Sequence, residues 1–179
     1  MDNIQAEIIS KFPPTYAAAL RQCSFYNLQE IRFRANRPVM LYFGDRTSYL
    51  AAQGGETDKK THAIVSDQQD IARLVSGFCR SSVYAYQEEI KEGFITIRGG
   101  HRIGISGKAI VDDGKVTNIG YFSGINIRIA REFPHSADGC MRYICSGDRI
   151  YNSIIISPPG VGKTTVLRDC ARQLSKRFK

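Results

Sequence analysis

The sequence lacks any run of about 18 apolar residues, the length that a helix usually needs to cross a membrane. No signal peptide is expected, because Asp2 and Glu7 stand where such a peptide has a basic flank and an apolar run. With 42% hydrophobic and 23% charged residues, the composition is that of a globular protein and excludes disordered, collagen-like and coiled-coil classes. We therefore expect a cytoplasmic, globular chain.

Patterns typical of disulfides and metal sites are also missing. The five cysteines are odd in number and contain no C-x-x-C pair, and the three histidines stand apart from one another and from the cysteines. These spacings disfavour both a disulfide framework and a zinc site. Reduced, buried thiols are expected instead.

Acidic residues are scarce in the second half of the chain. Residues 1–89 hold ten basic and ten acidic side chains, whereas residues 90–179 hold fifteen basic and seven acidic ones, so the net charge of +8 comes from the second half. This asymmetry suggests that the second half faces an anion, which could be a nucleotide, a nucleic acid or an acidic partner. A solvated basic surface is the alternative.

Residues 1–132 combine the patterns of helices and strands. Helical spacing of apolar residues, broken at Pro13 and Pro14, predicts two short helices, the second over 16–23. Ser66 and Gln69 have capping-box spacing and open a further helix, whose apolar face comprises Ile71, Leu74, Val75 and Phe78. Another helix is expected over 83–91. Strands are expected at 31–34, 39–43, 46–50, 61–65, 94–98, 102–111, 116–120 and 124–130. The result is an α+β domain whose antiparallel sheet carries helices on one face.

The strongest motif lies near the C-terminal end. Residues 153–156 form an apolar run typical of a strand buried on both faces, and a helix is expected from Lys163, with an apolar face that includes Val166, Leu167, Cys170 and Leu174. The glycines between them allow main-chain N–H groups to surround a phosphate. Lys163 would bind the β- and γ-phosphates, and the Thr164 hydroxyl would be a ligand of Mg²⁺. The expected nucleotide-binding residues are Pro159, Gly160, Val161, Gly162, Lys163, Thr164 and Thr165.

Ser157 occupies the first position of this motif, where the P-loop consensus has glycine. A glycine-rich turn that merely caps a helix is therefore the alternative. A second glycine cluster at 99–107 precedes a strand-like run instead of a helix, so we interpret it as turns and close strand packing. In the strand before residue 131, Arg128 points away from the isoleucines and Arg131 follows; they belong either to a solvated face or to a nucleotide site.

Several segments in one order resemble the stage III sporulation protein AA family. They are EIRFRANRP at 30–38, YAYQEEIKEGFIT at 84–96, GGHRIGISGKA at 99–109, INIRIARE at 125–132 and ISPPGVGKTT at 156–165. Ser157 fits the pattern of that family.

The resemblance implies a relative of secretion ATPases, in which an α/β domain precedes a RecA-like motor domain that uses ATP and Mg²⁺. Such proteins are expected to form hexameric rings in the mother-cell cytoplasm and to power membrane channel proteins between mother cell and forespore. By the same resemblance, Arg128 and Arg131 would reach a nucleotide and act in catalysis together with Lys163.

We divide the chain into an N-terminal α+β domain (1–132), a connector with a helix over 138–145 (133–152), and the first strand, P-loop and helix of a truncated α/β RecA-like P-loop NTPase domain (153–179). Only sixteen residues follow Lys163, so an acidic Walker B strand and its neighbours are absent, and this chain by itself is expected not to hydrolyse ATP.

Two other functions remain open. One is nucleic-acid binding by the basic half, which is disfavoured because the aromatic residues form no RNA-binding pattern with the basic ones. The other is a ring-assembly module with an idle P-loop.

Overall fold

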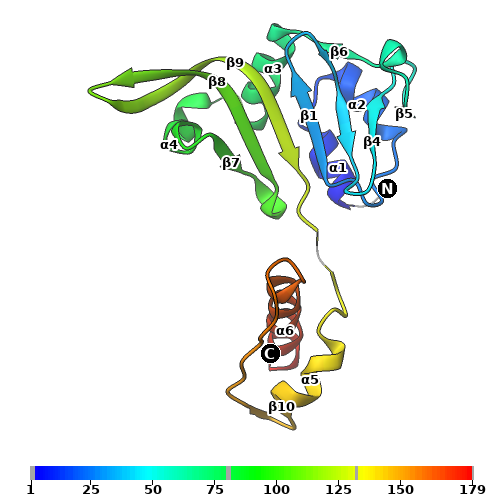
Figure 1. Cartoon of the computed structure of the whole chain (residues 1–179), viewed down its shortest axis with the longest axis vertical. Coiled ribbons are helices and arrows are strands. Elements are labelled where there is room, and N and C mark those ends of the chain that lie inside the picture. The colour runs from blue at the N-terminus through cyan, green and yellow to red at the C-terminus, as the bar shows by residue number, and fades with distance from the viewer. Residues whose placement is uncertain (1–2, 80–81, 132, 179) are drawn as a thin grey trace. The chain divides into compact units, whose positions relative to one another are not determined.

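The computed structural model describes residues 3–79, 82–131 and 133–178. They form two units, Met1–Ala130 and Arg131–Lys179, and each unit is described by itself (Figure 1).

The first unit is built on a seven-stranded sheet of order β5-β4-β3-β1-β9-β8-β7, in which all neighbouring strands are antiparallel. Its strands are β1 (Glu30–Arg34), β3 (Met40–Tyr42), β4 (Thr47–Leu50), β5 (Glu56–Thr57), β7 (Phe94–Thr96), β8 (Arg102–Asp112) and β9 (Lys115–Arg128). A separate two-stranded pair joins β2 (Arg37–Pro38) to β6 (Val65–Ser66). The helices are α1 (Asn3–Ile9), α2 (Pro14–Arg21), α3 (Gln68–Phe78) and α4 (Gln87–Lys91), with 3₁₀ turns η1 (Lys60–His62), η2 (Val83–Tyr86) and η3 (Arg98–Gly100).

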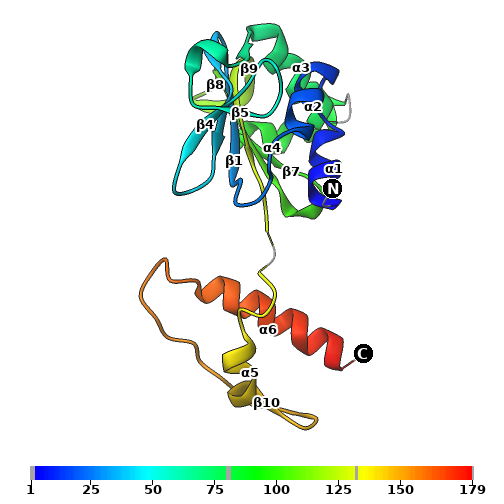
Figure 2. The same ribbon diagram turned by 90° about the vertical axis from the view of Figure 1, so that its right-hand side faces the viewer.

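The α-helices of this unit cover one face of the sheet, and no α-helix of the described residues lies on the other face (Figure 2). Side chains alternate between the two faces of a strand, so Ile31 and Phe33 of β1 are fully buried under the helices, whereas Arg32 lies on the helix-free face. Phe33 packs against Phe12 and Tyr16, with ring centroids 5.8 and 5.1 Å apart. The predicted α+β architecture is thus confirmed for this unit.

The helix expected after Ser66 begins one residue later than predicted. Asp67 is the residue that caps α3: its carboxylate accepts the Asp70 N–H, and the Asp70 carboxylate accepts the Asp67 N–H. Ser66 is buried and its hydroxyl donates to the Arg34 carbonyl oxygen. The predicted apolar face is confirmed, because Ile71, Leu74, Val75 and Phe78 are the buried residues of α3.

Two strand predictions in this unit were wrong. Residues 61–65 were expected to form a strand, but they contain the end of η1, an isolated bridge at Ala63 and the first residue of β6. The strands expected at 116–120 and 124–130 form one continuous strand, β9. Shifts in its register with β8, typical of β-bulges, allow the pairing to continue through the segment between them.

The second unit contains α5 (Asp138–Ile144), the short pair β10 (Cys145–Ser146) and β11 (Arg149–Ile150), and α6 (Lys163–Arg177). The helices expected in the connector and from Lys163 are therefore confirmed. None of the helices in the described residues of the whole chain is both long and apolar enough to span a membrane.

The buried strand expected at 153–156 is wrong. These residues have no regular secondary structure, and the Ile154 and Ile156 side chains are each 87% exposed. A strand buried on both faces needs neighbouring strands and cover on both sides. The described residues of the second unit pair no strand with this segment.

The inner face of α6 also differs from the expected apolar one. Its buried residues are Asp169 and Cys170, while Leu167 is 56% exposed. All five cysteines are free, as expected, and four of them are buried, with Cys140 half-buried.

Candidate functional site

The glycine-rich loop at 159–162 contains two glycines with a left-handed backbone and leads directly into α6. Gly160 and Gly162 have φ angles of 81° and 92°, in the left-handed region that residues with a side chain rarely adopt. Residues 159–162 form a turn and a bend, and α6 begins at the next residue. A Cβ atom at either glycine would meet no heavy atom within 4 Å, so the loop opens toward free space.

The start of α6 presents hydrogen-bond donors toward this loop. Its first hydrogen bond runs from the Val166 N–H to the Gly162 carbonyl oxygen, at 3.0 Å. The N–H groups of Lys163, Thr164 and Thr165 precede that bond and have no partner within the helix. The N-terminus of this 15-residue helix also carries partial positive charge. Together these features favour an anion at the loop.

Lys163 bridges the two ends of the loop. Its ammonium group donates to the carbonyl oxygens of Ser157 and Pro158, at 2.8 and 2.9 Å. The Lys163 side chain is half-buried. A third N–H of the ammonium group is left for a ligand.

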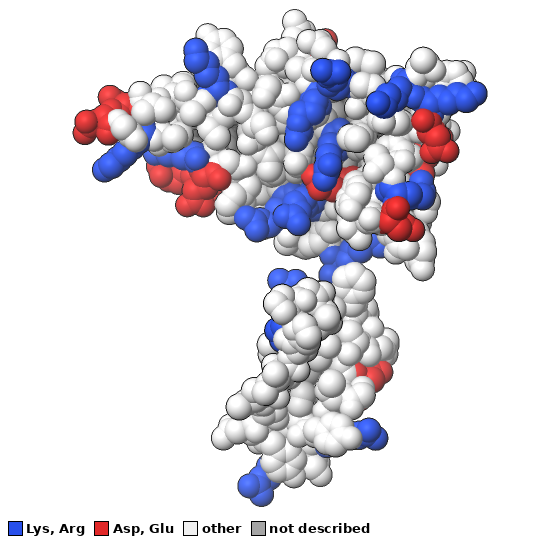
Figure 3. Space-filling model, in the orientation of Figure 1, with Lys and Arg blue, Asp and Glu red and all other residues white. Residues whose placement is uncertain are grey.

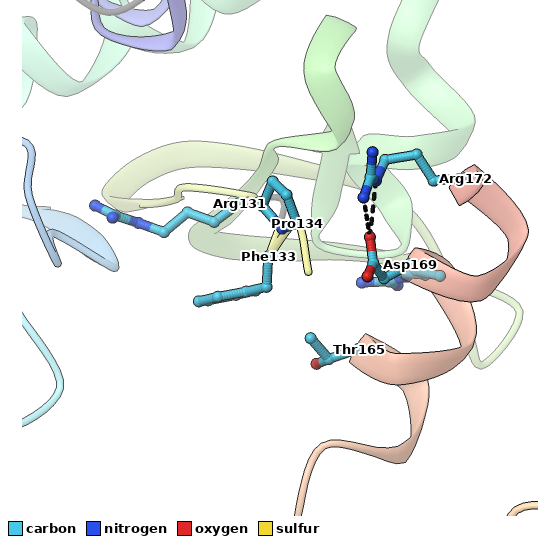
Figure 4. A pocket seen from close by; sticks show the side chains of 7 residues that line it. Arg131, Phe133, Pro134, Thr165, Asp169 and Arg172 are labelled. Atoms are coloured by element: carbon cyan, nitrogen blue, oxygen red, sulfur yellow. Dashed lines mark hydrogen bonds and ion pairs between the residues drawn. The ribbon is translucent and has the colours of Figure 1, made fainter. Parts of the chain in front are cut away.

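A cavity of about 220 Å³ adjoins the first turns of α6; we call it the Arg131 cavity (Figure 4). Phe133 and Pro134 form an apolar wall, and the Arg131 side chain points away from Thr165 and Asp169 (Figure 4). The complete lining consists of Arg131, Phe133, Pro134, Thr165, Arg168, Asp169 and Arg172. The cavity therefore combines positive charge with an aromatic ring beside the last residue of the P-loop motif.

Asp169 anchors α6 to the segment before α5, a role that the sequence analysis missed. Its side chain is only 2% exposed and accepts hydrogen bonds from the Ala137 N–H at 2.9 Å, from Arg172 Nε at 2.7 Å and from Gln173 Nε2 at 3.0 Å. Burial by itself raises the pKa of Asp169, but these donors outweigh it and lower the pKa to about 2. The spacing of Asp169 and Arg172, three residues apart on a helix, was the available signal in the sequence.

The predicted site residues fall into three groups. Pro159, Gly160, Val161 and Thr164 are exposed on or next to the loop, while Gly162, Lys163 and Thr165 are half-buried. Arg131 lines the Arg131 cavity together with Thr165. Arg128 is exposed at the end of β9 in the other unit, where it lies opposite Glu30 and Arg102 on the neighbouring strands. A nucleotide-contacting role for Arg128 and Arg131 stays a prediction.

The donor set fits a polyphosphate. Backbone N–H groups, one ammonium group and a hydroxyl at the second position of α6 are the groups that hold phosphates and share a magnesium ion with them. Among the residues that the structure describes, no group of three or more His, Cys, Asp or Glu side chains could hold a metal ion alone.

Comparison with known proteins assigns most of the chain to a single family. The family model described as "Sporulation stage III, protein AA" matches residues 17–178. Stage III sporulation protein AA of Bacillus subtilis (strain 168) is 35% identical over 170 residues, which cover 95% of this chain and 51% of that protein. The chain thus spans about half the length of this curated relative.

Among solved structures, the ATPase DotB of Legionella pneumophila is similar with a TM-score of 0.38 and 13% sequence identity. The similarity covers 83% of this chain and 38% of that one.

Proposed function

Since the chain belongs to the sporulation stage III, protein AA family, we propose that it contributes the ATP-binding loop of a motor subunit that acts in endospore formation. In the whole protein, this motor hydrolyses ATP and energises a secretion-like channel between mother cell and forespore. The observation that carries the proposal is the loop at 159–162, with two left-handed glycines that lead directly into α6.

The chain's own residues have distinct roles in this proposal. The N–H groups from Gly160 to Thr165 surround the phosphates, and Lys163 places its charge beside them. The Thr164 hydroxyl is a ligand for Mg²⁺. When bound, ATP with Mg²⁺ supplies the phosphoryl transfer on which such a motor depends. Arg128 and Arg131 are the candidates to stabilise charge that develops on the phosphate, at a site in the assembled protein.

The Arg131 cavity offers a place for the rest of the nucleotide. It adjoins Thr165 and presents the Phe133 ring and the Pro134 ring on one side. Aromatic and apolar side chains with a few charged groups are typical of sites for ring-containing ligands. We therefore place the base or ribose against Phe133, and the phosphates at the loop.

Titration of this chain with ATP and Mg²⁺, followed by calorimetry, tests the proposal. Lys163→Ala should weaken binding at least about tenfold, because it removes the only charge that the motif directs at the phosphates. Lys176→Ala is the matched control: it removes a lysine of the same helix, from the exposed last turn, and should change affinity less than about twofold. Equal affinities for the parent chain and Lys163→Ala would leave the ring-assembly module with an idle P-loop as the better hypothesis.

A second titration separates the loop from the Arg131 cavity. Phe133→Ala should weaken ATP binding while leaving the affinity for tripolyphosphate unchanged, because tripolyphosphate has no ring to place against Phe133. If ATP affinity also stays unchanged, the base lies elsewhere.

Assembly and location complete the proposal. We propose that the full-length protein forms a hexameric ring on the cytoplasmic side of the mother-cell membrane and contacts membrane channel proteins there. The native mass of the full-length protein with and without ATP tests the ring. Crosslinking in sporulating cells tests the contact.

A further inference from the structure

A second cluster of basic residues lies in the first unit, on the face of the sheet that carries no helix. Arg32 and Arg34 alternate along β1 with the buried Ile31 and Phe33, which directs both guanidinium groups to this face. Lys and Arg side chains are spread over the same face in Figure 3. None of these residues belongs to the P-loop or to the Arg131 cavity.

A cavity of about 340 Å³ opens at this cluster, and we call it the Arg34 cavity. It lies within the first unit, over β1 and the strands beside it. Its lining consists of Arg32, Arg34, Arg37, Pro38, Met40, Tyr49 and Lys60. Four of these residues are cationic and none is acidic, so the cavity is suited to an anion.

Among the residues that the structure describes, ion pairs neutralise one of the four cations, Arg32. Arg32 donates to both carboxylate oxygens of Glu30, from Nε at 3.0 Å and from Nη2 at 3.1 Å. Within the described part of the chain, the ion pairs involve neither Arg34, Arg37 nor Lys60. The cavity therefore carries an excess of positive charge.

The Arg34 guanidinium is held in place without being neutralised. Its Nη1 donates to the carbonyl oxygens of Phe33 at 2.7 Å and Ile125 at 3.5 Å. Burial and the neighbouring charge of Arg32 lower the pKa of Arg34 and outweigh the opposite effect of the Glu30 carboxylate, so its charged form is disfavoured relative to an arginine in water. A bound anion would offset both effects, since it would interact favourably with each arginine.

The remaining lining residues indicate what accompanies the anionic group. Pro38 and Met40 are apolar, and the Lys60 ammonium group lies 5.9 Å from the centre of the Tyr49 ring. The volume is at the lower end of the range of small-molecule pockets. Planar guanidinium groups match the oxygens of phosphate, and a pocket that combines them with an apolar wall suits a phosphate attached to an organic group.

We propose that the Arg34 cavity is a binding site for the phosphate group of a small organic phosphate, with Arg34, Arg37 and Lys60 as its principal contacts. Two sources share this chemistry, a free phosphorylated metabolite and a phospholipid headgroup. The site is independent of the proposed ATP-binding loop.

The test uses the whole chain carrying Lys163→Ala, so that the P-loop does not contribute to phosphate binding. Inorganic pyrophosphate is titrated and followed by NMR chemical shifts. In a second arm, the same protein is sedimented with vesicles of phosphatidylcholine and phosphatidylglycerol, or of phosphatidylcholine alone. Arg34→Gln, and the double variant Arg37→Gln with Lys60→Gln, are compared with Arg21→Gln, which removes an exposed arginine from α2.

Pyrophosphate should shift resonances around the cavity, and affinity should fall about tenfold in both cavity variants while Arg21→Gln stays within about twofold of the parent. Arg37 and Lys60 are exposed, so the double variant keeps the test valid even if Arg34→Gln unfolds. Selective sedimentation with phosphatidylglycerol vesicles, lost in the cavity variants, would identify a lipid headgroup as the source. The proposal is overturned if neither probe binds, if binding is equal in all variants, or if only a polyglutamate peptide binds in an Arg34-dependent way.

Discussion

The two units differ in how far their isoleucine side chains are buried. In the first unit, Ile31 of β1 and Ile125 and Ile127 of β9 are fully buried between the sheet and its helices. In the second unit, Ile154 and Ile156 are each 87% exposed. In this chain, isoleucine side chains are fully buried where neighbouring strands and covering helices surround them.

The helices repeat this contrast. All four buried residues of α3 are apolar, whereas the two buried residues of α6 are Asp169 and Cys170. Packing holds α3 against its sheet, while the buried Asp169 carboxylate of α6 accepts the Ala137 N–H from outside the helix and two further hydrogen bonds from side chains of α6 itself. The stability of α6 should therefore depend on protonation, and that of α3 on side-chain volume.

The largest expected difference between the units is in amide exchange. Among the described residues, no backbone hydrogen bond holds the amides of 153–157, whereas β9 is paired on both sides along 124–128. The opening free energy measured by exchange should equal that of global unfolding, about 5–15 kcal/mol, for amides in β9. For the amides of 153–157 it should be close to zero. Exchange followed by mass spectrometry measures both. Equal protection would show that residues 153–157 are held by contacts that we have not identified.

Truncation of a core side chain comes next in size. Phe33→Ala should lower the free energy of unfolding of the first unit by about 3–5 kcal/mol, because Phe33 is fully buried against Phe12 and Tyr16. Ile156→Ala, at an exposed position of the second unit, should change stability by less than about 0.5 kcal/mol. Urea denaturation of both variants measures the loss in the free energy of unfolding. It decides whether the buried position contributes more to stability than the exposed one.

Arginines from both sides of the unit boundary can be compared in a full-length family member. Replacing the equivalents of Arg128 or Arg131 by alanine should lower ATP turnover at least about tenfold, or roughly 1.4 kcal/mol in the barrier, while nucleotide affinity stays within a few-fold. Replacing the equivalent of Arg142, which lies in α5, serves as the control and should change little. Parental turnover in both of these variants would assign Arg128 and Arg131 to a solvated face.

Two glycines of the second unit should respond to alanine with opposite signs. A Cβ atom meets no neighbour at Gly162 or at Gly139, but Gly162 has a φ of 92° and Gly139 lies in the helix α5. Gly162→Ala should destabilise the start of α6 by about 1–2 kcal/mol, and Gly139→Ala should stabilise α5 by about 0.5–1 kcal/mol. Amide exchange in the two helices measures each effect. Equal effects would mean that the left-handed backbone at Gly162 is not required.

The smallest perturbation is protonation of Asp169. Because folding lowers the pKa of Asp169 from its ordinary value of about 3.8 to about 2, its stabilising contribution is complete above pH about 3.8 and is lost as the pH falls through about 2. The chemical shift of the Ala137 amide, which donates to this carboxylate, should titrate with that lower midpoint. Asp169→Asn should abolish the titration. A midpoint near the ordinary value would contradict the anchoring role.

Local sequence patterns predicted the features that depend on residues close together in the chain or on the periodicity of a helix or strand. The apolar face of α3, the alternation in β1 and the start of α6 at Lys163 were all predictable, because spacing along a helix or strand decides which side chains share a face. The α3 cap was misplaced by one residue because Ser66 and Asp67 are both good caps, and the choice depends on the bond from Ser66 to Arg34.

The sequence by itself determined the family, the α+β class of the first unit and the glycine-rich loop before a helix. Only the tertiary structure decided that Asp169 rather than an apolar side chain anchors α6, and that Arg34, Arg37 and Lys60 line one cavity. The physical reason is that burial and charge clustering depend on groups that lie far apart in the chain. The spacing of residues along a helix or strand predicts which of its faces is apolar or basic. The rest of the fold determines which residues pack against that face.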